Sequence, residues 1–157
     1  MEKSRVTIYT DGGCSPNPGP GGWGVVLISP DHNGHIKELS GAETQSTNNR
    51  MELTAAIMAL RSLKRPCEVN LHTDSQYLKK AFTENWLNNW LRNGWKNANR
   101  KPVANKDLWL ELIELNKVHN INWRWVKGHS TDIHNKRCDQ LVSEAREKFI
   151  KKGKPVL

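Results

Sequence analysis

The sequence predicts an α/β fold in which five strands form a mixed sheet, an antiparallel meander beside parallel strands, flanked by helices. Three strand-like segments follow one another in the first half, at residues 5–11, 23–29 and 36–42, and this succession suits a meander. The second half alternates helical with strand-like segments, and strands joined through a helix run parallel in one sheet. With 157 residues, the chain is expected to form one domain over residues 1–157.

The first strand is expected to end at an aspartate. Val6 and Ile8 alternate with polar neighbours, a period-2 pattern rich in β-branched residues, up to Asp11 and the two glycines that open a loop. Residues 19–22 in this loop are rich in glycine, but they lack a Lys-Ser/Thr pair and lead into a strand instead of a helix. We therefore interpret them as a turn and not as a phosphate-binding loop.

Helices are predicted from apolar periodicity and capping residues. Thr47 or Asn48 can cap the first helix, which has one apolar face and stops before Pro66. A short helix that starts at Trp86 is expected to end at Gly94. The other expected elements are a strand at 68–73, helices at 75–83 and 107–117, a strand at 121–126, a last helix at 135–151, and a disordered tail from about residue 152.

The chain is strongly basic, with 24 Lys and Arg against 16 Asp and Glu and a formal charge of +8. This charge favours a polyanionic partner, either nucleic acid or an anionic membrane surface. No apolar run approaches the ~18 residues of a membrane span, and the first residues lack the core of a signal peptide, so we expect a cytoplasmic protein. Cys14, Cys67 and Cys138 are scattered without Cys-x-x-Cys spacing, which argues against a disulfide framework and a zinc site.

Four carboxylates are candidates for one acidic site. Asp11 and Asp74 each follow a strand, and ligands of open α/β sheets bind beyond the carboxyl ends of strands. Glu52 falls in the first turn of the helix that Thr47 or Asn48 caps, and Asp139 in the second turn of the last helix. Ordinary alternatives exist, since aspartate before Gly or Ser suits turns and caps, and glutamate in a first turn suits the helix dipole.

Carboxylates packed together repel one another unless a cation compensates their charge. Mg²⁺ or Mn²⁺ is the natural countercharge for an all-oxygen cluster, and two such ions about 3.5–4 Å apart can promote phosphodiester hydrolysis. His129, in a glycine-flanked loop after the last strand, is a candidate proton carrier. The alternative for His129 is a solvent-exposed loop histidine.

Residues 86–106 combine positive charge with tryptophan. The segment holds five basic residues and no acidic one, and Trp86, Trp90 and Trp95 are interleaved among them. Two interpretations remain open, a solvated basic face over a local tryptophan core, or a surface that grips a nucleic-acid backbone.

Four stretches resemble bacterial-type (type 1) ribonuclease H in their order and approximate spacing. They are Tyr-Thr-Asp11-Gly-Gly-Cys with Asn-Pro-Gly-Pro-Gly-Gly-Trp-Gly, Thr47-Asn-Asn-Arg-Met-Glu52-Leu, Thr73-Asp74-Ser-Gln-Tyr, and Trp-Val-Lys-Gly-His129 with Arg-Cys-Asp139. The resemblance extends from the first strand into the last helix. It implies endonucleolytic cleavage of the RNA strand of RNA–DNA hybrids with two Mg²⁺ or Mn²⁺ ions, leaving a 5′-phosphate and a 3′-hydroxyl.

The resemblance also implies roles for individual residues. Asp11 would bridge both metals, and Asp139 would bind the metal that activates water. Glu52 and Asp74 would hold the second metal, and His129 would assist proton transfer or product departure. The implied contacts near the scissile bond are Cys14, Asn17, Asn48, Asn49 and Gln76, because amides and backbone groups can read 2′-hydroxyls. Thr47 would grip a phosphate of the DNA strand, and the implied contacts of a basic protrusion with that strand are Trp86, Trp90, Trp95, Lys96 and Arg100.

The chain departs from the family pattern at several positions. Leu91 and Asn93 stand where bacterial relatives usually carry Lys or Arg, and one residue is inserted between the motif at Asp74 and Trp86. We therefore expect hybrid binding that is weaker and less sensitive to salt. His134 and Lys136 replace residues that are commonly acidic, and Lys136 is expected to lower the negative charge near Asp139.

Three other functional hypotheses compete with the hydrolase hypothesis. One is a catalytically silent protein of the same fold that binds hybrids or single strands, and another is a different nuclease or strand-transfer enzyme with a similar acidic sheet edge, such as a Holliday-junction resolvase. The intact acidic positions argue against the first, and the Asn-Asn and Gln positions argue against the second. A membrane-surface protein would need a helix that pairs a basic face with exposed aromatic or leucine residues, which the sequence lacks. We expect a monomer.

Overall fold

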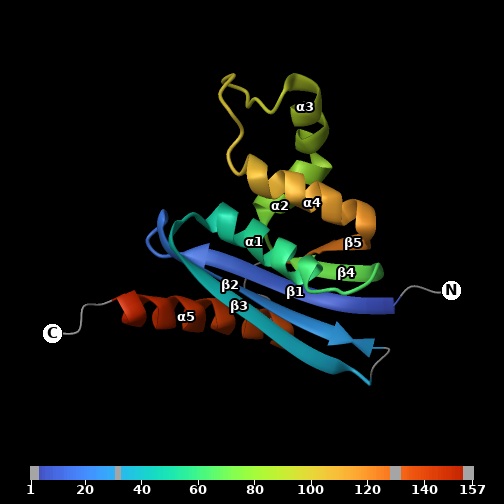
Figure 1. Ribbon diagram of the computed structural model, residues 1–157, viewed down its shortest axis with the longest axis vertical. Helices are drawn as coiled ribbons and strands as arrows, with labels where there is room; N and C mark the ends of the chain where they lie inside the picture. Colours follow the sequence, from blue (N-terminus) through green and yellow to red (C-terminus); the bar gives the residue numbers. More distant parts are fainter. Residues whose placement is uncertain (1–3, 31–32, 128–131, 154–157) are drawn as a thin grey trace.

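The computed structural model describes residues 4–30, 33–127 and 132–153. They form a five-stranded mixed sheet in the order β3-β2-β1-β4-β5, with helices on both faces (Figure 1). The strands are β1 Ser4–Cys14, β2 Gly19–Ser29, β3 His35–Ser46, β4 Cys67–Thr73 and β5 Asn120–Trp125. The helices are α1 Asn48–Arg61, α2 Gln76–Thr83, α3 Trp86–Asn93, α4 Lys106–Val118 and α5 Ile133–Gly153. The predicted fold class is confirmed.

The sheet consists of an antiparallel half and a parallel half. Strands β1, β2 and β3 pair as the predicted meander, whereas β4 runs parallel to β1 and β5 runs parallel to β4. The ladder between β1 and β4 stops at the pair Tyr9 and His72, but the ladder between β1 and β2 continues to Cys14 and Gly21. The first strand therefore forks away from β4 while it remains paired with β2.

Two expectations about this region were wrong. Strand β1 does not end at Asp11 but continues for three more residues, and residues 19–22 belong to β2 instead of forming a turn. The turn is shorter and consists of residues 15–18, all of them exposed. The physical reason is that glycine carries no side-chain pattern, so these residues gained their strand conformation from backbone pairing with one another.

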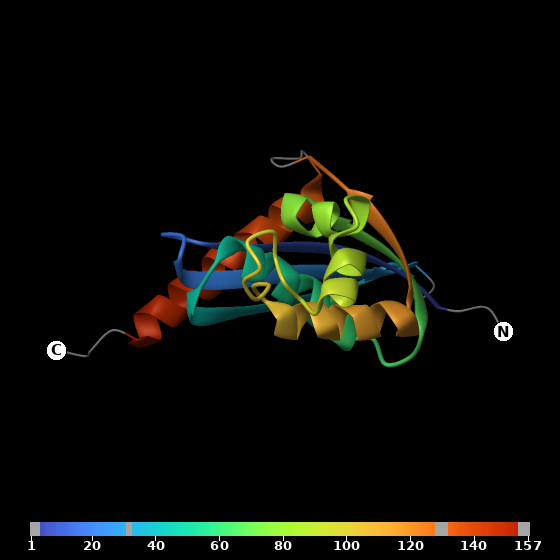
Figure 2. The same cartoon turned by 90° about the horizontal axis from the view of Figure 1, so that it is seen from above.

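The two faces of the sheet carry different helices. Helix α1 packs on one face with α4 against it, and α5 packs on the opposite face across β1, β2 and β3 (Figures 1 and 2). The main core lies on the α1 side and contains Ile8, Leu53 and Trp109, each fully buried. A smaller cluster on the α5 side joins Tyr9 and Val26 to residues of α5.

Capping residues set the helix boundaries. The Thr47 hydroxyl accepts a hydrogen bond from Arg50 N (3.1 Å), so Thr47 and not Asn48 caps α1. Gly94 ends α3 with a φ of 78°, as predicted. Helix α5 reaches Gly153, so residues 152–153 are helical rather than disordered, and the rest of the predicted tail lies outside the described residues. Within the described ranges, no helix is both long enough and apolar enough to cross a membrane.

Candidate active site

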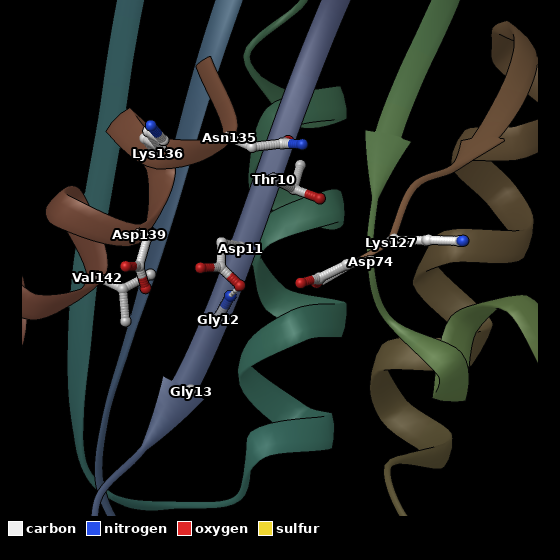
Figure 3. Close-up of a pocket in the computed structure, with 10 residues that line it drawn as sticks. All are labelled: Thr10, Asp11, Gly12, Gly13, Asp74, Lys127, Asn135, Lys136, Asp139 and Val142. Atoms are coloured by element: carbon white, nitrogen blue, oxygen red, sulfur yellow. Dashed lines mark hydrogen bonds between the residues drawn. The ribbon is translucent and has the colours of Figure 1, made fainter. Parts of the chain in front are cut away.

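The fork in the sheet brings two carboxylates together. Asp11 lies on β1 just beyond the point where its ladder with β4 stops, and Asp74 follows the last residue of β4. Figure 3 shows the Asp74 carboxylate directed toward Asp11 across this gap. The splayed strand ends therefore create the space that the sequence argument expected at this edge.

Close approach at two glycines brings in the other two carboxylates. A methyl group at Gly12 would lie 2.4 Å from the carbonyl carbon of Met51 and 2.6 Å from the nitrogen of Glu52, so the backbone of α1 touches β1 there. On the opposite face, a methyl group at Gly24 would lie 2.7 Å from the carbonyl oxygen of Cys138 on α5, the residue before Asp139. Because Gly24 pairs with Asp11, both helices reach the sheet at the same level. Glycine inside a strand can indicate close backbone approach, but neither glycine was identified from the sequence as part of the site.

Three of the four carboxylates, those of Asp11, Asp74 and Asp139, border an open hollow of about 470 Å³. Its lining consists of Thr10, Asp11, Gly12, Gly13, Asp74, Lys127, Asn135, Lys136, Asp139 and Val142 (Figure 3). Asp11 occupies the middle, with Asp139 on one side and Asp74 on the other. Asp139 is exposed and lies in the second turn of α5, as predicted.

Glu52 does not line the hollow, but its charge acts on Asp11 and its carboxylate is oriented by a serine. The helix starts at Asn48, so Glu52 is its fifth residue and not part of the first turn, which contains no acidic residue. The dipole explanation for Glu52 is therefore weak, because the effect falls off beyond the first turn. Instead, the Ser75 hydroxyl donates a hydrogen bond of 2.5 Å to Glu52 Oε2. The Ser75 hydroxyl oxygen also accepts a hydrogen bond from Leu78 N and thereby caps α2. Sequence reasoning missed Ser75 because the contact joins two distant helices.

Burial and repulsion between carboxylates raise the pKa values of Asp11 and Glu52. Burial, followed by the charges of the three neighbouring acidic residues, raises the pKa of Asp11 to about 7, although a hydrogen bond from Gly12 N opposes the rise. Burial also raises the pKa of Glu52 to about 7, with a smaller contribution from Asp74 that the Ser75 hydrogen bond opposes. A cation in the hollow would relieve both effects.

The donor set fits a hard divalent cation that is only partly enclosed by protein. All four candidate ligands are carboxylates, and such oxygen donors suit Mg²⁺ or Mn²⁺. In the described part of the chain, no three acidic, histidine or cysteine side chains lie close enough together to hold a metal ion by themselves. An open arrangement suits Mg²⁺ because this ion keeps several waters and usually binds one or two carboxylates together with substrate phosphates.

Two lysines also line the hollow. Lys136 lies one helical turn before Asp139 on α5, and Lys127 follows β5. This position agrees with the expectation that Lys136 acts near Asp139. His129, the predicted proton carrier, lies outside the described residues.

The start of α5 contacts an aromatic cluster formed by Tyr9, His72 and His134, which was not predicted from the sequence. Asp132 accepts a hydrogen bond from His134 N (2.8 Å) through one carboxylate oxygen, and the Tyr9 hydroxyl donates to the other at 3.3 Å. The Tyr9 ring lies 4.4 Å from the ring of His72 and 5.1 Å from that of His134. No local pattern could have indicated the contacts of Tyr9, because its partners lie more than 60 positions away in the sequence.

Three of the predicted substrate contacts form one bonded unit. Cys14 N donates to Asn48 Oδ1 (2.7 Å), and Asn48 N donates to Asn17 Oδ1 (3.1 Å), so the β1–β2 turn is tied to the start of α1. The Thr47 hydroxyl accepts from the backbone as a cap but keeps its own proton to donate. Asn49 and Gln76 are exposed at the starts of α1 and α2.

The tryptophans of the protrusion, defined here as residues 86–106, pack largely on one another. The Trp90 ring lies 5.9 Å from Trp86, 5.8 Å from Trp95 and 5.6 Å from the buried ring of Trp109. Trp95 is 9% exposed, so its ring supports the protrusion and is not available for stacking on a base. Trp86 and Trp90 are half-buried and line an open hollow of about 700 Å³, together with exposed polar residues that include Lys96. Arg100 is also exposed.

Asn93, one of the departures from the family pattern, has a structural role. Its side-chain amide donates to Lys96 O (2.9 Å), and its side-chain oxygen accepts from Lys96 N (3.0 Å). These bonds close the loop after α3, which a lysine or arginine side chain could not do in this way because neither has an acceptor. Leu91 is 54% exposed and makes the surface of the protrusion more apolar.

The fold and the site together define a nucleic-acid hydrolase. The chain is basic, three of its aspartates line a hollow at a fork of the sheet, and a basic protrusion extends from the same molecule. These features suit metal-assisted chemistry on a phosphodiester.

Comparisons with known proteins identify the family. The family model for RNase H matches residues 3–147. The ribonuclease H of Gluconobacter oxydans (strain 621H) is 56% identical over 148 residues, which cover 94% of this chain and 96% of that protein. The ribonuclease H of Caldanaerobacter subterraneus subsp. tengcongensis is 55% identical over 148 residues, 94% of this chain and 95% of that protein. The chain belongs to the ribonuclease H family, whose members degrade RNA in RNA–DNA hybrids.

Solved structures support the same assignment. LC9-RNase H1, a type 1 RNase H with the type 2 active-site motif, superimposes with a TM-score of 0.81 at 30% identity, covering 94% of this chain and 74% of that one. LC11-RNase H1 in complex with an RNA/DNA hybrid gives a TM-score of 0.68 at 27% identity, covering 92% of this chain and 99% of that one. The resemblance to bacterial-type ribonuclease H is thus confirmed.

Proposed function

We propose that this chain is an endonuclease that hydrolyses the RNA strand of RNA–DNA hybrids with two divalent cations, leaving a 5′-phosphate and a 3′-hydroxyl. The observation that carries the proposal is the meeting of Asp11, Asp74 and Asp139 beside one hollow, where burial and the charges of these aspartates and of Glu52 on α1 raise the pKa of Asp11. LC11-RNase H1, which is 27% identical to this chain, binds an RNA/DNA hybrid, and this supports the choice of substrate.

Asp11, Glu52, Asp74 and Asp139 would hold the cations, Mg²⁺ or Mn²⁺. When bound, such cations supply activation of water and stabilisation of the leaving oxygen. Asp11 suits a shared ligand because it lies between Asp74 and Asp139. Asp139 suits the side on which water enters, since it is exposed, and Ser75 fixes the orientation of Glu52. We assign proton transfer or product departure to His129 on the family resemblance alone.

The substrate would lie across the hollow and the protrusion. The unit formed by Cys14, Asn17 and Asn48 presents amide and backbone groups that can read 2′-hydroxyls near the scissile bond. We add Asn49 and Gln76 to this surface because they are exposed at neighbouring helix starts. Thr47, Lys96, Arg100 and the half-buried tryptophans would contact the DNA strand. We further propose that the protein acts in the cytoplasm as a monomer.

The test is cleavage of a hybrid labelled on its RNA strand, in Mg²⁺ and separately in Mn²⁺. Double-stranded RNA and double-stranded DNA of the same sequence serve as controls, and Asp11→Asn serves as the matched variant. We expect RNA-strand cutting confined to the hybrid and lost in the variant, with products that a polymerase can extend from their 3′-hydroxyl. Tight hybrid binding without cleavage in either metal would overturn the proposal and indicate a silent binding protein.

A further inference from the structure

Arg146 on α5 binds the two sides of the β1–β2 turn. Its Nε donates to Pro20 O at 3.1 Å, and its Nη2 donates to Ser15 O at 2.7 Å. Ser15 is the first residue of the turn formed by residues 15–18 and Pro20 follows this turn in β2, and Ser15 N also donates to Pro20 O at 3.4 Å. The planar guanidinium therefore bridges both ends of the turn with charge-assisted hydrogen bonds.

The turn depends on such contacts because it is otherwise open to solvent. Residues 15–18 are all exposed, so burial contributes little to holding them in place. On the α1 side, Asn48 binds Cys14 and Asn17. Arg146 binds the same turn from the α5 side, so two helices on opposite faces of the sheet hold it between them.

Glycine 22 makes room for this arrangement. A methyl group at Gly22 would lie 2.7 Å from Cγ of Arg146 and 2.7 Å from Val142 O. The stem of Arg146 thus packs directly on the backbone of β2 before its guanidinium reaches the turn. This packing limits the positions that the guanidinium can adopt, which lowers the entropic cost of its two hydrogen bonds.

We infer that Arg146 is a positioning residue for substrate recognition, which holds the β1–β2 turn where Cys14 and Asn17 can read an RNA–DNA hybrid. Both of its described acceptors are main-chain carbonyls of the turn, so it acts through the turn and not on a phosphate. The inference rests on the proposed function, because it takes the hybrid as the substrate of the turn.

Three variants of the full chain test this role. Arg146→Met keeps an apolar stem and removes the guanidinium, whereas Arg146→Lys keeps the charge but cannot reproduce the planar fork. Lys148→Met removes one positive charge from an exposed side chain two residues further along α5 and serves as the charge-matched control. Fluorescence anisotropy without divalent metal gives the Kd for a labelled hybrid and for double-stranded DNA over a range of salt concentrations.

For Arg146→Met, we expect hybrid affinity to fall about three- to tenfold while affinity for double-stranded DNA and the salt slope stay unchanged. The KM for hybrid cleavage should rise with little change in kcat, and Arg146→Lys should lie between Arg146→Met and the unaltered chain. Lys148→Met should affect the two duplexes equally.

Two results would overturn the inference. Equal weakening of both duplexes with a shallower salt slope would show that Arg146 contacts phosphate directly. A lower melting temperature with unchanged hybrid affinity would show that it only supports the fold. If the unaltered chain neither binds nor cleaves a hybrid, the proposed function itself fails, and this outcome is distinct because it precedes any effect of the variants.

Discussion

Replacing Asp11 by asparagine should stabilise the metal-free protein at alkaline pH while abolishing activity. The carboxyl group lies among three other acidic residues, and its pKa is raised from 3.8 to about 7, first by burial and then by those charges. The full rise corresponds to roughly 4 kcal/mol of destabilisation once Asp11 is ionised. Asparagine has nearly the same shape and carries no charge, and its side-chain oxygen can still accept the 2.9 Å hydrogen bond from Gly12 N.

The direction of the pH dependence follows from proton binding. Between about pH 4 and pH 7 the folded chain holds a proton on Asp11 that the unfolded chain has lost, so stability falls as the pH rises through this range. The site is open to water, and repulsion between Glu52 and Asp74 remains in the variant. We therefore expect a gain of about 1–2 kcal/mol at pH 8, or about 3–6 °C in melting temperature, and roughly a third of that gain at pH 5.

Thermal unfolding in EDTA at pH 5 and pH 8 measures this difference, and repetition in Mg²⁺ supplies the second half of the test. Mg²⁺ should stabilise the unaltered chain more than the variant, because a ligand that binds only the folded state raises its stability. An equal gain at both pH values, or a loss of stability at pH 8, would refute the reasoning. Asn70→Asp, which adds a carboxyl group on β4 away from the hollow, controls for general charge effects.

Three further predictions concern the residues around the site. Lys136→Glu should tighten Mg²⁺ binding about two- to fivefold by calorimetry, since Lys136 lines the hollow beside Asp139, and an unchanged affinity would count against this electrostatic role. Leu91→Lys should tighten hybrid binding and steepen its salt slope by up to about 0.9, as anisotropy at several salt concentrations can measure, and no change in slope would exclude a phosphate contact at this exposed position. Asn48→Ala should raise the KM for hybrid more than Asn48→Asp does, because aspartate keeps the oxygen that accepts from Cys14 N; equal KM values would show that the tie is unimportant.

Much of the fold was predictable because its signals are local. Apolar periodicity and Gly94 placed both ends of α2, α3, α4 and α5 within two residues, whereas α1 ends at Arg61, well before its predicted limit at Pro66. The same approach failed at residues 12–14 and 19–22, where glycine-rich segments carry no side-chain alternation and became strand only by pairing with each other. Such pairing is a non-local property, so periodicity cannot detect it.

In the candidate site, too, some features were predictable from the sequence and others were not. The four carboxylates were identified from their motifs, but the partner of Glu52 was not, since Ser75 lies on another helix. The tryptophans of the protrusion were recognised, yet the burial of Trp95 depends on packing against Trp90 and on the fold around it. Burial of a side chain is decided by its neighbours in space, most of which are distant in the sequence.

By itself, the sequence determined the order of the elements, the mixed sheet, the family and the carboxylates on which the proposed chemistry depends. The tertiary structure alone decided that β1 forks from β4 beyond Tyr9, that helices touch the sheet at Gly12 and Gly24, and that Arg146 holds the β1–β2 turn. The physical reason is that secondary structure and motifs are properties of neighbouring residues. The raised pKa of Asp11 is instead a property of distance and burial, which exist only once the chain has folded.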